Sequence, residues 1–208
     1  TGNNELAVSN VVGSNIFNLM VVIGVCAMIA TVNVAKETIK RDIPFSLICA
    51  GLLLFLGIAG FGDKAGMILG HLDGVIFLGA FAGYISYMIK VALKASKEGR
   101  KVEIEGASEG EIRLISVPLS ILFIIGGAAA IAVGGDITVD AASRIASDLG
   151  MSQTLIGLTI VSIGTSLPEL VTSIVAARKN EVDMALGNAI GSNVFNILMV
   201  LGIASAIS

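Results

Sequence analysis

A single carboxylate stands in the middle of a long apolar stretch. Glu169 is the only charged residue within positions 149–177, and two hydroxyl-bearing residues and a proline precede it: Thr165, Ser166 and Pro168. Proline lacks an amide hydrogen and its ring clashes with the carbonyl four residues earlier, so a helix here is expected to bend or unwind over residues 164–168. A carbonyl oxygen without a hydrogen-bond partner is unfavourable in free energy in an apolar environment, and a desolvated cation would bind such oxygens.

A second polar feature occurs twice. The string Gly-Ser-Asn-x-Phe-Asn stands at residues 13–18 and again at 191–196. Its serine and second asparagine are four residues apart and therefore share one helix face: Ser14 with Asn18, and Ser192 with Asn196. The middle asparagines point elsewhere and are expected to bond backbone or neighbouring helices: Asn15 and Asn193. The glycines of both copies are expected to allow close helix packing: Gly13, Gly24, Gly191 and Gly202.

Together these residues predict an all-oxygen site with one negative charge. Ca²⁺ and Na⁺ prefer such ligands, whereas Zn²⁺ and Cu⁺ prefer histidine or cysteine. The two cysteines, Cys26 and Cys49, lie in apolar stretches and are expected to pack as small hydrophobic residues. The single histidine, His71, is expected in a surface loop. Serine and asparagine also bridge membrane helices without binding a ligand, so a purely structural role stays open.

The elements that must hold these residues are membrane helices. The chain is 55% hydrophobic and 14% charged, which excludes an ordinary soluble domain. Six stretches lack charged residues, and most reach the roughly 20 residues that a bilayer-spanning helix needs. The sequence therefore predicts an all-α membrane protein with helices at about 6–33, 43–61, 73–93, 112–134, 150–178 and 183–207.

The basic residues are distributed unevenly between the two ends of these helices. Of the 13 lysines and arginines, only Lys64 and Arg144 fall on one side of the membrane, and the other eleven fall on the opposite side. Because basic residues are enriched in cytoplasmic loops, the side with eleven is predicted to be cytoplasmic. Its segments lie near 36–41, 94–113 and 178–182. The two Gly-Ser-Asn copies then enter the membrane from opposite sides, which indicates an inverted repeat. An outer loop is expected at 135–153, with three carboxylates: Asp136, Asp140 and Asp148.

The two polar regions resemble a known family. GTSLPELVTS at 164–173, followed by GNAIGSNVFNILMVLG at 187–202, is similar to the second α-repeat of the cation/calcium exchanger superfamily, in its bacterial sodium/calcium antiporter branch. VSNVVGSNIFNLMVVIG at 8–24 resembles the latter half of the first α-repeat. The resemblance implies a fold of ten helices in two inverted sets of five, of which this chain would supply the third to the eighth.

The halves implied by this resemblance are residues 1–94 and 112–208, joined by a cytoplasmic connector at 95–111. We expect the chain to be a piece of a longer protein. The resemblance also implies the cation ligands: Glu169 at the centre, oxygens of Thr165 and Ser166, the backbone carbonyl of Ser162, and side chains of Ser192, Asn196, Ser14 and Asn18. A partner Gly-Thr-Ser-x-Pro-Glu segment is not in the chain, and Asn196 stands where some members carry aspartate.

These observations predict a secondary antiporter in the plasma membrane that exchanges Ca²⁺ for Na⁺. Two alternatives remain: a Ca²⁺/H⁺ exchanger of the same fold, and a membrane scaffold that transports nothing. An enzyme is not expected, because no His, Cys or Asp pairing offers a base and Ser166 has no evident activating partner. The expected partners are the two transported ions and the lipid bilayer, with no resident cofactor and no nucleic acid.

Overall fold

The computed structural model describes residues 3–59, 69–97 and 116–207, and over these ranges the chain is helical without strands. Six helical stretches are long and apolar enough to cross a membrane, which confirms the predicted number. They are Ala7–Ile29, Thr38–Ile58, His71–Lys94, Val117–Asp148, Thr154–Arg178 and Val182–Ile207.

Several of these stretches join α-helical pieces through a π-helical turn, labelled η. In chain order the elements are α1 (Asn3–Phe17), η1 (Asn18–Val22), α2 (Ile23–Ile29), η2 (Thr38–Asp42), α3 (Ile43–Ala59), α4 (His71–Lys97), α5 (Val117–Asp148), α6 (Gln153–Ile156), η3 (Gly157–Val161), α7 (Ser162–Arg178), α8 (Val182–Phe195), η4 (Asn196–Val200) and α9 (Leu201–Ile207).

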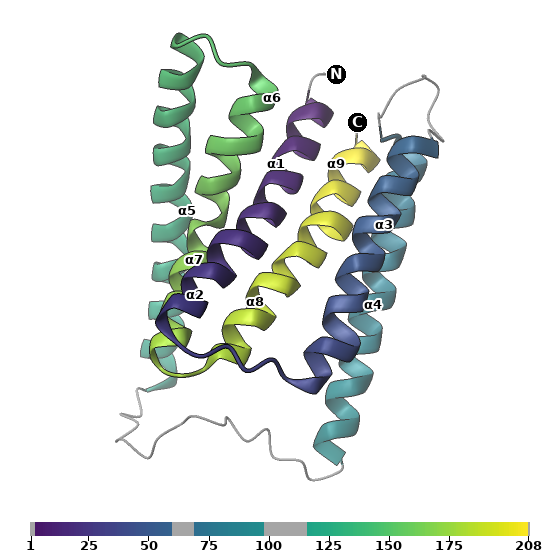
Figure 1. The fold of residues 1–208 in the computed structure, drawn as a ribbon, viewed down its shortest axis with the longest axis vertical. Helices are drawn as coiled ribbons and strands as arrows, with labels where there is room; N and C mark the ends of the chain where they lie inside the picture. The colour runs from purple at the N-terminus through teal and green to yellow at the C-terminus, as the bar shows by residue number, and fades with distance from the viewer. Residues whose placement is uncertain (1–2, 60–68, 98–115, 208) are drawn as a thin grey trace.

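The two copies of the repeated string lie beside one another at the centre of the bundle. The continuous stretch α1–η1–α2 contains the first copy, and α8–η4–α9 contains the second. They run in opposite directions (Figure 1), as the inverted-repeat interpretation requires. A π turn starts at the last residue of each copy, Asn18 and Asn196. The two repeats therefore share a local distortion as well as a sequence.

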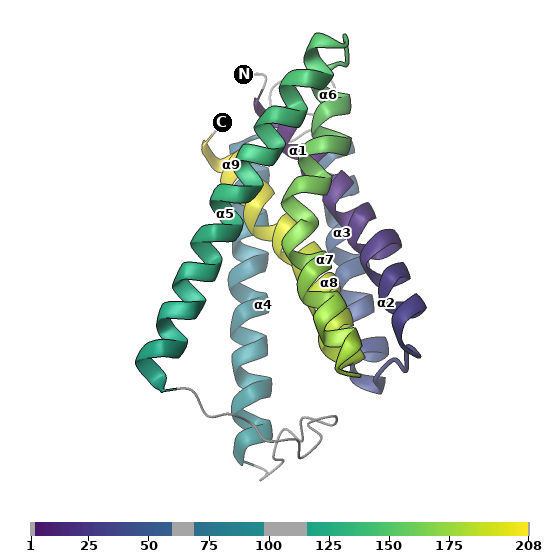
Figure 2. The ribbon, with the colours of Figure 1, turned by 90° about the vertical axis from the view of Figure 1, so that its left-hand side faces the viewer.

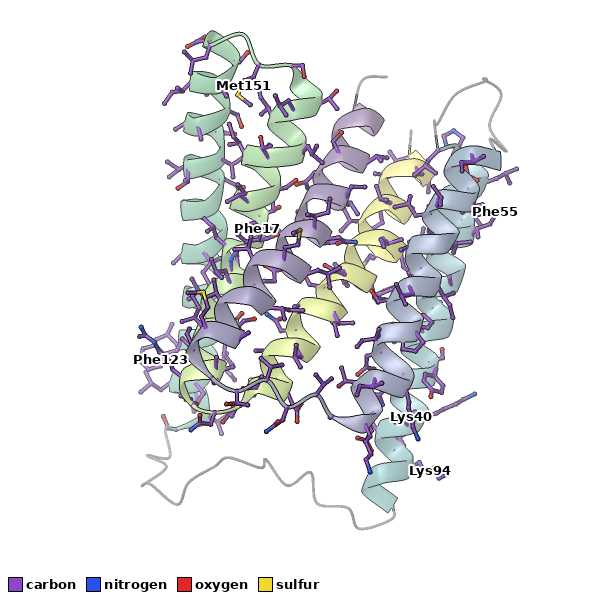
Figure 3. All side chains as sticks on the ribbon, in the orientation of Figure 1. Phe17, Lys40, Phe55, Lys94, Phe123 and Met151 are labelled. Atoms are coloured by element: carbon purple, nitrogen blue, oxygen red, sulfur yellow. The ribbon has the colours of Figure 1, made fainter. Side chains whose placement is uncertain are left out.

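The remaining helices flank this central pair. The α6–η3–α7 stretch packs against α1 and α8, while α3 and α4 lie on the other side, with α4 along α9 (Figure 1). Helix α5 inclines away from the bundle below its contact with α6 and α7 (Figure 2). Apolar side chains project outward from α3, α4 and α5 (Figure 3), as expected of surfaces that face lipid.

One predicted helix boundary is wrong. The helix expected at 112–134 is α5, which continues to Asp148. Asp136, Asp140 and Asp148 therefore lie on this helix and not in an outer loop. Glycines and carboxylates after residue 134 resemble a loop in the sequence, but a helix tolerates both once it extends beyond the apolar layer, where water solvates the charges. Predictions from hydropathy thus truncated this helix.

The other sequence expectations on packing are partly confirmed. Cys26 and Cys49 are buried, in agreement with a packing role. His71 is exposed but is the first residue of α4, so its placement in a loop is wrong; its Nδ1 lies 3.2 Å from the carbonyl oxygen of Ser205. The connector expected at 95–111 falls outside the described residues, except for its first three positions, which belong to α4.

The glycines of the two repeats differ in their surroundings. A side chain at Gly13 would collide with the backbone oxygen of Leu158 and with Ser162, so α1 approaches η3 and α7 as closely as backbones allow. Gly202 packs against Phe77 and Leu78 of α4. Gly24 and Gly191 have no described atom within 4 Å of a Cβ position, so the expected close contact is wrong for these two within the described part of the chain.

The connections between successive helices lie at alternating ends of the bundle, as predicted. Lys40 and Lys94 lie at one end of the bundle, and Met151 lies at the other (Figure 3). The links from α2 to η2 and from α7 to α8 are both at the end that carries these lysines (Figure 1). The assignment of this end to the cytoplasm stays a prediction from the charge distribution.

Candidate cation site

Helix α7 carries a polar face through the middle of the bundle. Ser162, Thr165, Ser166 and Glu169 are separated by three or four residues, so they line one side of the helix. Ser162 and Ser166 are buried, with 1% and 2% of their surface exposed, and Glu169 is half-buried. Four of the predicted ligands thus come from one face of a single helix.

The expected unwinding at the proline is wrong. Helix α7 is continuous through Pro168, and the distortion lies about two to three turns before the proline, in the π turn η3 at Gly157–Val161. Nearby hydroxyl and amide groups take up carbonyls around the proline: Thr172 Oγ1 donates to the carbonyl of Pro168 at 2.8 Å, and Asn188 Nδ2 to that of Glu169 at 3.4 Å. Both carbonyls follow in the helix, whereas the carbonyl that loses its amide partner at the proline is that of Gly164, four residues earlier.

The first repeat meets α7 through its serine. Ser14 Oγ lies 3.1 Å from Thr165 Oγ1 and donates to the carbonyl oxygen of Ser162 at 3.3 Å. Thr165 Oγ1 also donates to the Ser162 carbonyl, at 3.2 Å. The structure therefore brings together three predicted ligands, the two hydroxyl groups and the backbone carbonyl, although Ser14 is more than 140 residues from the other two in the sequence.

Asn10 belongs to the same cluster, although it was not among the predicted ligands. Its Oδ1 lies 3.5 Å from Ser14 Oγ and accepts from Thr165 Oγ1 at 3.3 Å, and its carbonyl oxygen accepts from Ser162 Oγ at 2.9 Å. A sequence signal for it exists, because Asn10 precedes Ser14 by one helical turn. Its counterpart Asn188 precedes Ser192 by the same interval.

The second repeat meets α7 at the carboxylate. Ser192 Oγ donates to Glu169 Oε1 at 2.6 Å. A short turn between α7 and α8 makes this contact possible, since α8 starts four residues after α7 ends and returns along it. Asn180 occupies this turn at φ 60°, a left-handed conformation that asparagine adopts more readily than most residues.

The last two predicted ligands lie in a network of amides between the repeats. Asn18 Nδ2 donates to Asn193 Oδ1 at 3.0 Å, and Asn196 Nδ2 donates to Asn15 Oδ1 at 3.2 Å. Asn15 and Asn193 also donate to each other's backbone carbonyls, each at 3.3 Å. The expectation that these two bond backbone and a neighbouring helix is confirmed.

The eight predicted residues therefore fall into three adjacent groups. Ser14, Ser162 and Thr165 share hydrogen bonds, Glu169 pairs with Ser192, and Asn18 and Asn196 join the amide network. Ser166 is buried on the same face of α7 as Glu169. Among the described residues, no hydrogen bond links the Glu169 carboxylate directly to the Ser14 group or to the amide network between the repeats.

The donor set is made of oxygen and carries one negative charge. No group of three His, Cys, Asp or Glu side chains occurs within the described ranges, so a soft-metal site is not assembled there. Asn18 is fully buried, and its Oδ1 has no hydrogen-bond partner among the described residues. A buried amide oxygen without a partner costs about 1–3 kcal/mol, which a hard cation could offset.

Most of the chain matches a known protein family. Residues 1–90 and 119–208 match the sodium/calcium exchanger protein family. The CaxA protein of Alkalimonas amylolytica is 37% identical over 210 residues, which cover 100% of this chain and 62% of CaxA. The chain thus spans about three-fifths of the length of this curated relative.

Two solved structures share the fold. The sodium/calcium exchanger from Methanococcus jannaschii superposes with a TM-score of 0.67 at 31% identity, over 97% of this chain and 59% of that one. An H⁺/Ca²⁺ exchanger superposes with a TM-score of 0.63 over 100% of this chain and 53% of that one, at 18% identity, so the likeness concerns the fold alone. With six membrane-spanning helices, two inverted copies of one motif and a match over most of its length, the chain belongs to the sodium/calcium exchanger family.

Proposed function

We propose that the protein containing this chain is a secondary antiporter that exchanges Ca²⁺ for Na⁺ through the oxygen cluster around Glu169. The observation that carries this proposal is the contact between Glu169 and Ser192, on the polar face of α7 that also meets Ser14. The two inverted repeats and the proline-containing helix thereby contribute to one polar region. Hard cations prefer carboxylate, hydroxyl and carbonyl oxygens.

The depth of these residues supports a site near the bilayer midplane. Asn18 is the central residue of the span Ala7–Ile29, and Ser166 is the central residue of Thr154–Arg178. Inverted-repeat transporters hold their ions at this level, at the interface between the repeats. A carboxylate at that depth is costly without a cation, so the occupied and empty states differ in how readily they reorient.

The remaining ligands are expected outside this chain. Glu169 alone supplies one negative charge against the two of Ca²⁺, and Asn196 adds none. The implied partner segment with a second glutamate would complete the charge. Gly191 leaves room for it, because the equivalent Gly13 is covered by η3 and α7, whereas Gly191 has no described atom within 4 Å of its Cβ position. We therefore expect residues 1–208 alone to bind ions poorly and to transport none.

A proton-driven exchanger is the second candidate. The fold is shared with an H⁺/Ca²⁺ exchanger, and Glu169 could exchange a proton as well as a cation. The fold and the described residues are compatible with either driving ion, so a flux measurement must distinguish them.

The test is uptake of radioactive Ca²⁺ into proteoliposomes made with the full reading frame. Vesicles are loaded with Na⁺ or given a pH gradient, and the wild type is compared with Glu169→Gln. Glu37→Gln is the matched control, since Glu37 is exposed at the end of the bundle away from the repeats' contact. We expect uptake to require the outward Na⁺ gradient and to be lost only in Glu169→Gln.

Each alternative has its own outcome in this experiment. Uptake driven by a pH gradient and indifferent to Na⁺ would favour the proton-driven exchanger. Uptake equal in Glu169→Gln and in the wild type would contradict the proposed site. Absence of uptake under both gradients would contradict antiport and favour the scaffold alternative.

A further inference from the structure

The amide network between the repeats is symmetric, and its two halves are related by the sequence repeat. Adding 178 to a residue number in the first copy gives its counterpart in the second. Under this exchange the bond from Asn15 Nδ2 to the Asn193 carbonyl becomes the bond from Asn193 Nδ2 to the Asn15 carbonyl, both at 3.3 Å. The contacts between these two asparagines are therefore reciprocal, as expected of two repeats related by an approximate two-fold axis.

The bonds to the predicted ligands follow the same rule. Asn18 Nδ2 is held by Asn193 Oδ1 at 3.0 Å, and Asn196 Nδ2 is held by Asn15 Oδ1 at 3.2 Å. Each predicted ligand is thus fixed by the middle asparagine of the opposite repeat. The pairing is crossed: neither middle asparagine holds the ligand of its own copy.

This arrangement locks the orientation of all four amides. Reversing the Asn193 amide would place its nitrogen against the nitrogen of Asn18 and its oxygen against the carbonyl of Asn15. Two hydrogen bonds would become two repulsive contacts. Asn193 is 1% exposed and Asn18 is 0% exposed, so water is not available to replace the lost bonds.

The locked orientation decides which atom of each ligand remains free. The nitrogen of Asn18 is occupied by Asn193, and its buried Oδ1 has no partner among the described residues. The nitrogen of Asn196 is occupied in the same way by Asn15. Amide groups bind hard cations through oxygen. The network engages the amide nitrogens in hydrogen bonds and leaves the amide oxygens to bind the cation.

We infer that Asn15 and Asn193 are positioning residues of the cation site, each orienting the ligand asparagine of the opposite repeat. This inference rests on the proposed function, because it assumes that Asn18 and Asn196 bind the ion. It goes further, because it makes cation binding by the asparagine ligand of one repeat depend on a residue of the other repeat. A simple bridging role for the same asparagines would tie the helices together without this crossed dependence.

The crossed dependence can be measured by double-mutant cycles on Ca²⁺ affinity in the full-length protein. The single variants Asn193→Ala and Asn18→Ala should each weaken Ca²⁺ binding by about three- to tenfold, as expected for one lost hydrogen bond or ligand. Their combination should weaken it little further, because Asn193 acts through Asn18. Asn193→Ala combined with Asn196→Ala should instead show nearly multiplicative losses.

The second arm of the design uses the opposite pair. Asn15→Ala should be non-additive with Asn196→Ala and nearly multiplicative with Asn18→Ala. Asn15 is only half-buried, so this arm remains informative if Asn193→Ala does not fold. Val194→Ala, a truncation of the buried neighbour of Asn193, is the control for loosened packing and should leave both cycles unchanged.

The outcomes separate the inference from the proposed function. Wild-type binding that Glu169→Gln abolishes, together with the crossed pattern, supports both. The same binding with all double variants multiplicative, or with uncrossed coupling, overturns the positioning role and leaves the site intact. A wild-type protein that binds no Ca²⁺, or whose binding survives Glu169→Gln, overturns the proposed site and the inference with it.

Discussion

At the residue scale, the hydrogen bond between Ser192 and Glu169 is the contact on which the proposed cation site depends most directly. Its length of 2.6 Å is typical of a hydroxyl that donates to a carboxylate. This bond fixes one carboxylate oxygen relative to α8 and leaves the other for additional partners. Ser192 therefore orients Glu169 and offers an oxygen of its own.

Removing this hydroxyl should weaken cation binding. Hydrogen bonds to charged groups contribute about 1.5–3 kcal/mol, so Ser192→Ala is expected to lower Ca²⁺ affinity by at least about tenfold. Equilibrium binding of radioactive Ca²⁺ to the full-length protein measures this effect. Ser86→Ala is the control, since Ser86 bonds its own helix on an exposed face of α4. Equal affinity in both variants would show that Ser192 has no part in the site.

At the element scale, close contact between α1 and the η3–α7 stretch brings the first repeat to the polar face. Gly13 permits this contact, since a Cβ there would collide with the backbone oxygen of Leu158. A backbone atom cannot move aside as the end of a flexible side chain can. The position of Ser14 next to Thr165 depends on this approach.

Gly13→Ala should therefore destabilise the protein. Overpacking a tight contact costs about 1–3 kcal/mol, and the thermal midpoint of the protein in detergent should fall accordingly. Gly24→Ala is the matched control on α2, where no described atom lies within 4 Å of the Cβ position. Alanine also favours a helix over glycine, so Gly24→Ala should be neutral or slightly stabilising. Equal midpoints for the two variants would argue against the close contact.

Most elements could be predicted from the sequence, and the exceptions have physical causes. Hydropathy located all six spans, because a bilayer imposes a long apolar segment on each. It could not place the end of α5, since helix beyond the apolar layer has loop-like composition. It also could not reveal the π turns at Asn18 and Asn196, because a single extra residue in a turn barely changes an apolar pattern.

The site was predictable to a similar degree. Residue types and motif spacing pointed to Glu169 and both serine–asparagine pairs, which α7 and the two repeats bring into neighbouring groups; their role as cation ligands stays a prediction. The unwinding expected at Pro168 is absent, since α7 continues through this residue as one helix. The crossed partners of the amides depend on how two distant helices face each other, and no local pattern contains that information.

At the scale of the whole molecule, inverted insertion of the two repeats is the organising feature. The central stretches run in opposite directions (Figure 1). The same amide contacts join them from either side. The charge distribution predicts that the end bearing Lys40 and Lys94 faces the cytoplasm. The inverted insertion and this orientation together determine from which side of the membrane each copy of the motif enters.

This orientation can be tested with single cysteines and a membrane-impermeant thiol reagent. Leu149→Cys, in the turn between α5 and α6, should react in intact cells. Lys179→Cys, in the turn between α7 and α8, should react only after the cells are made permeable. Both positions are exposed, and the native Cys26 and Cys49 are buried and so should contribute little background. The reverse labelling pattern would contradict the assignment of the cytoplasmic end.

The most direct test of the central claim is equilibrium Ca²⁺ binding to the full-length protein in the presence of increasing Na⁺. Removing the charge of a partly buried cation ligand costs about 2 kcal/mol or more, so Glu169→Gln should weaken Ca²⁺ binding by at least about 30-fold. Glu37→Gln should bind as the wild type does, and Na⁺ should displace Ca²⁺ from both. Undiminished Ca²⁺ binding in Glu169→Gln, or wild-type binding that Na⁺ leaves unchanged, would contradict a shared site for the two ions at Glu169.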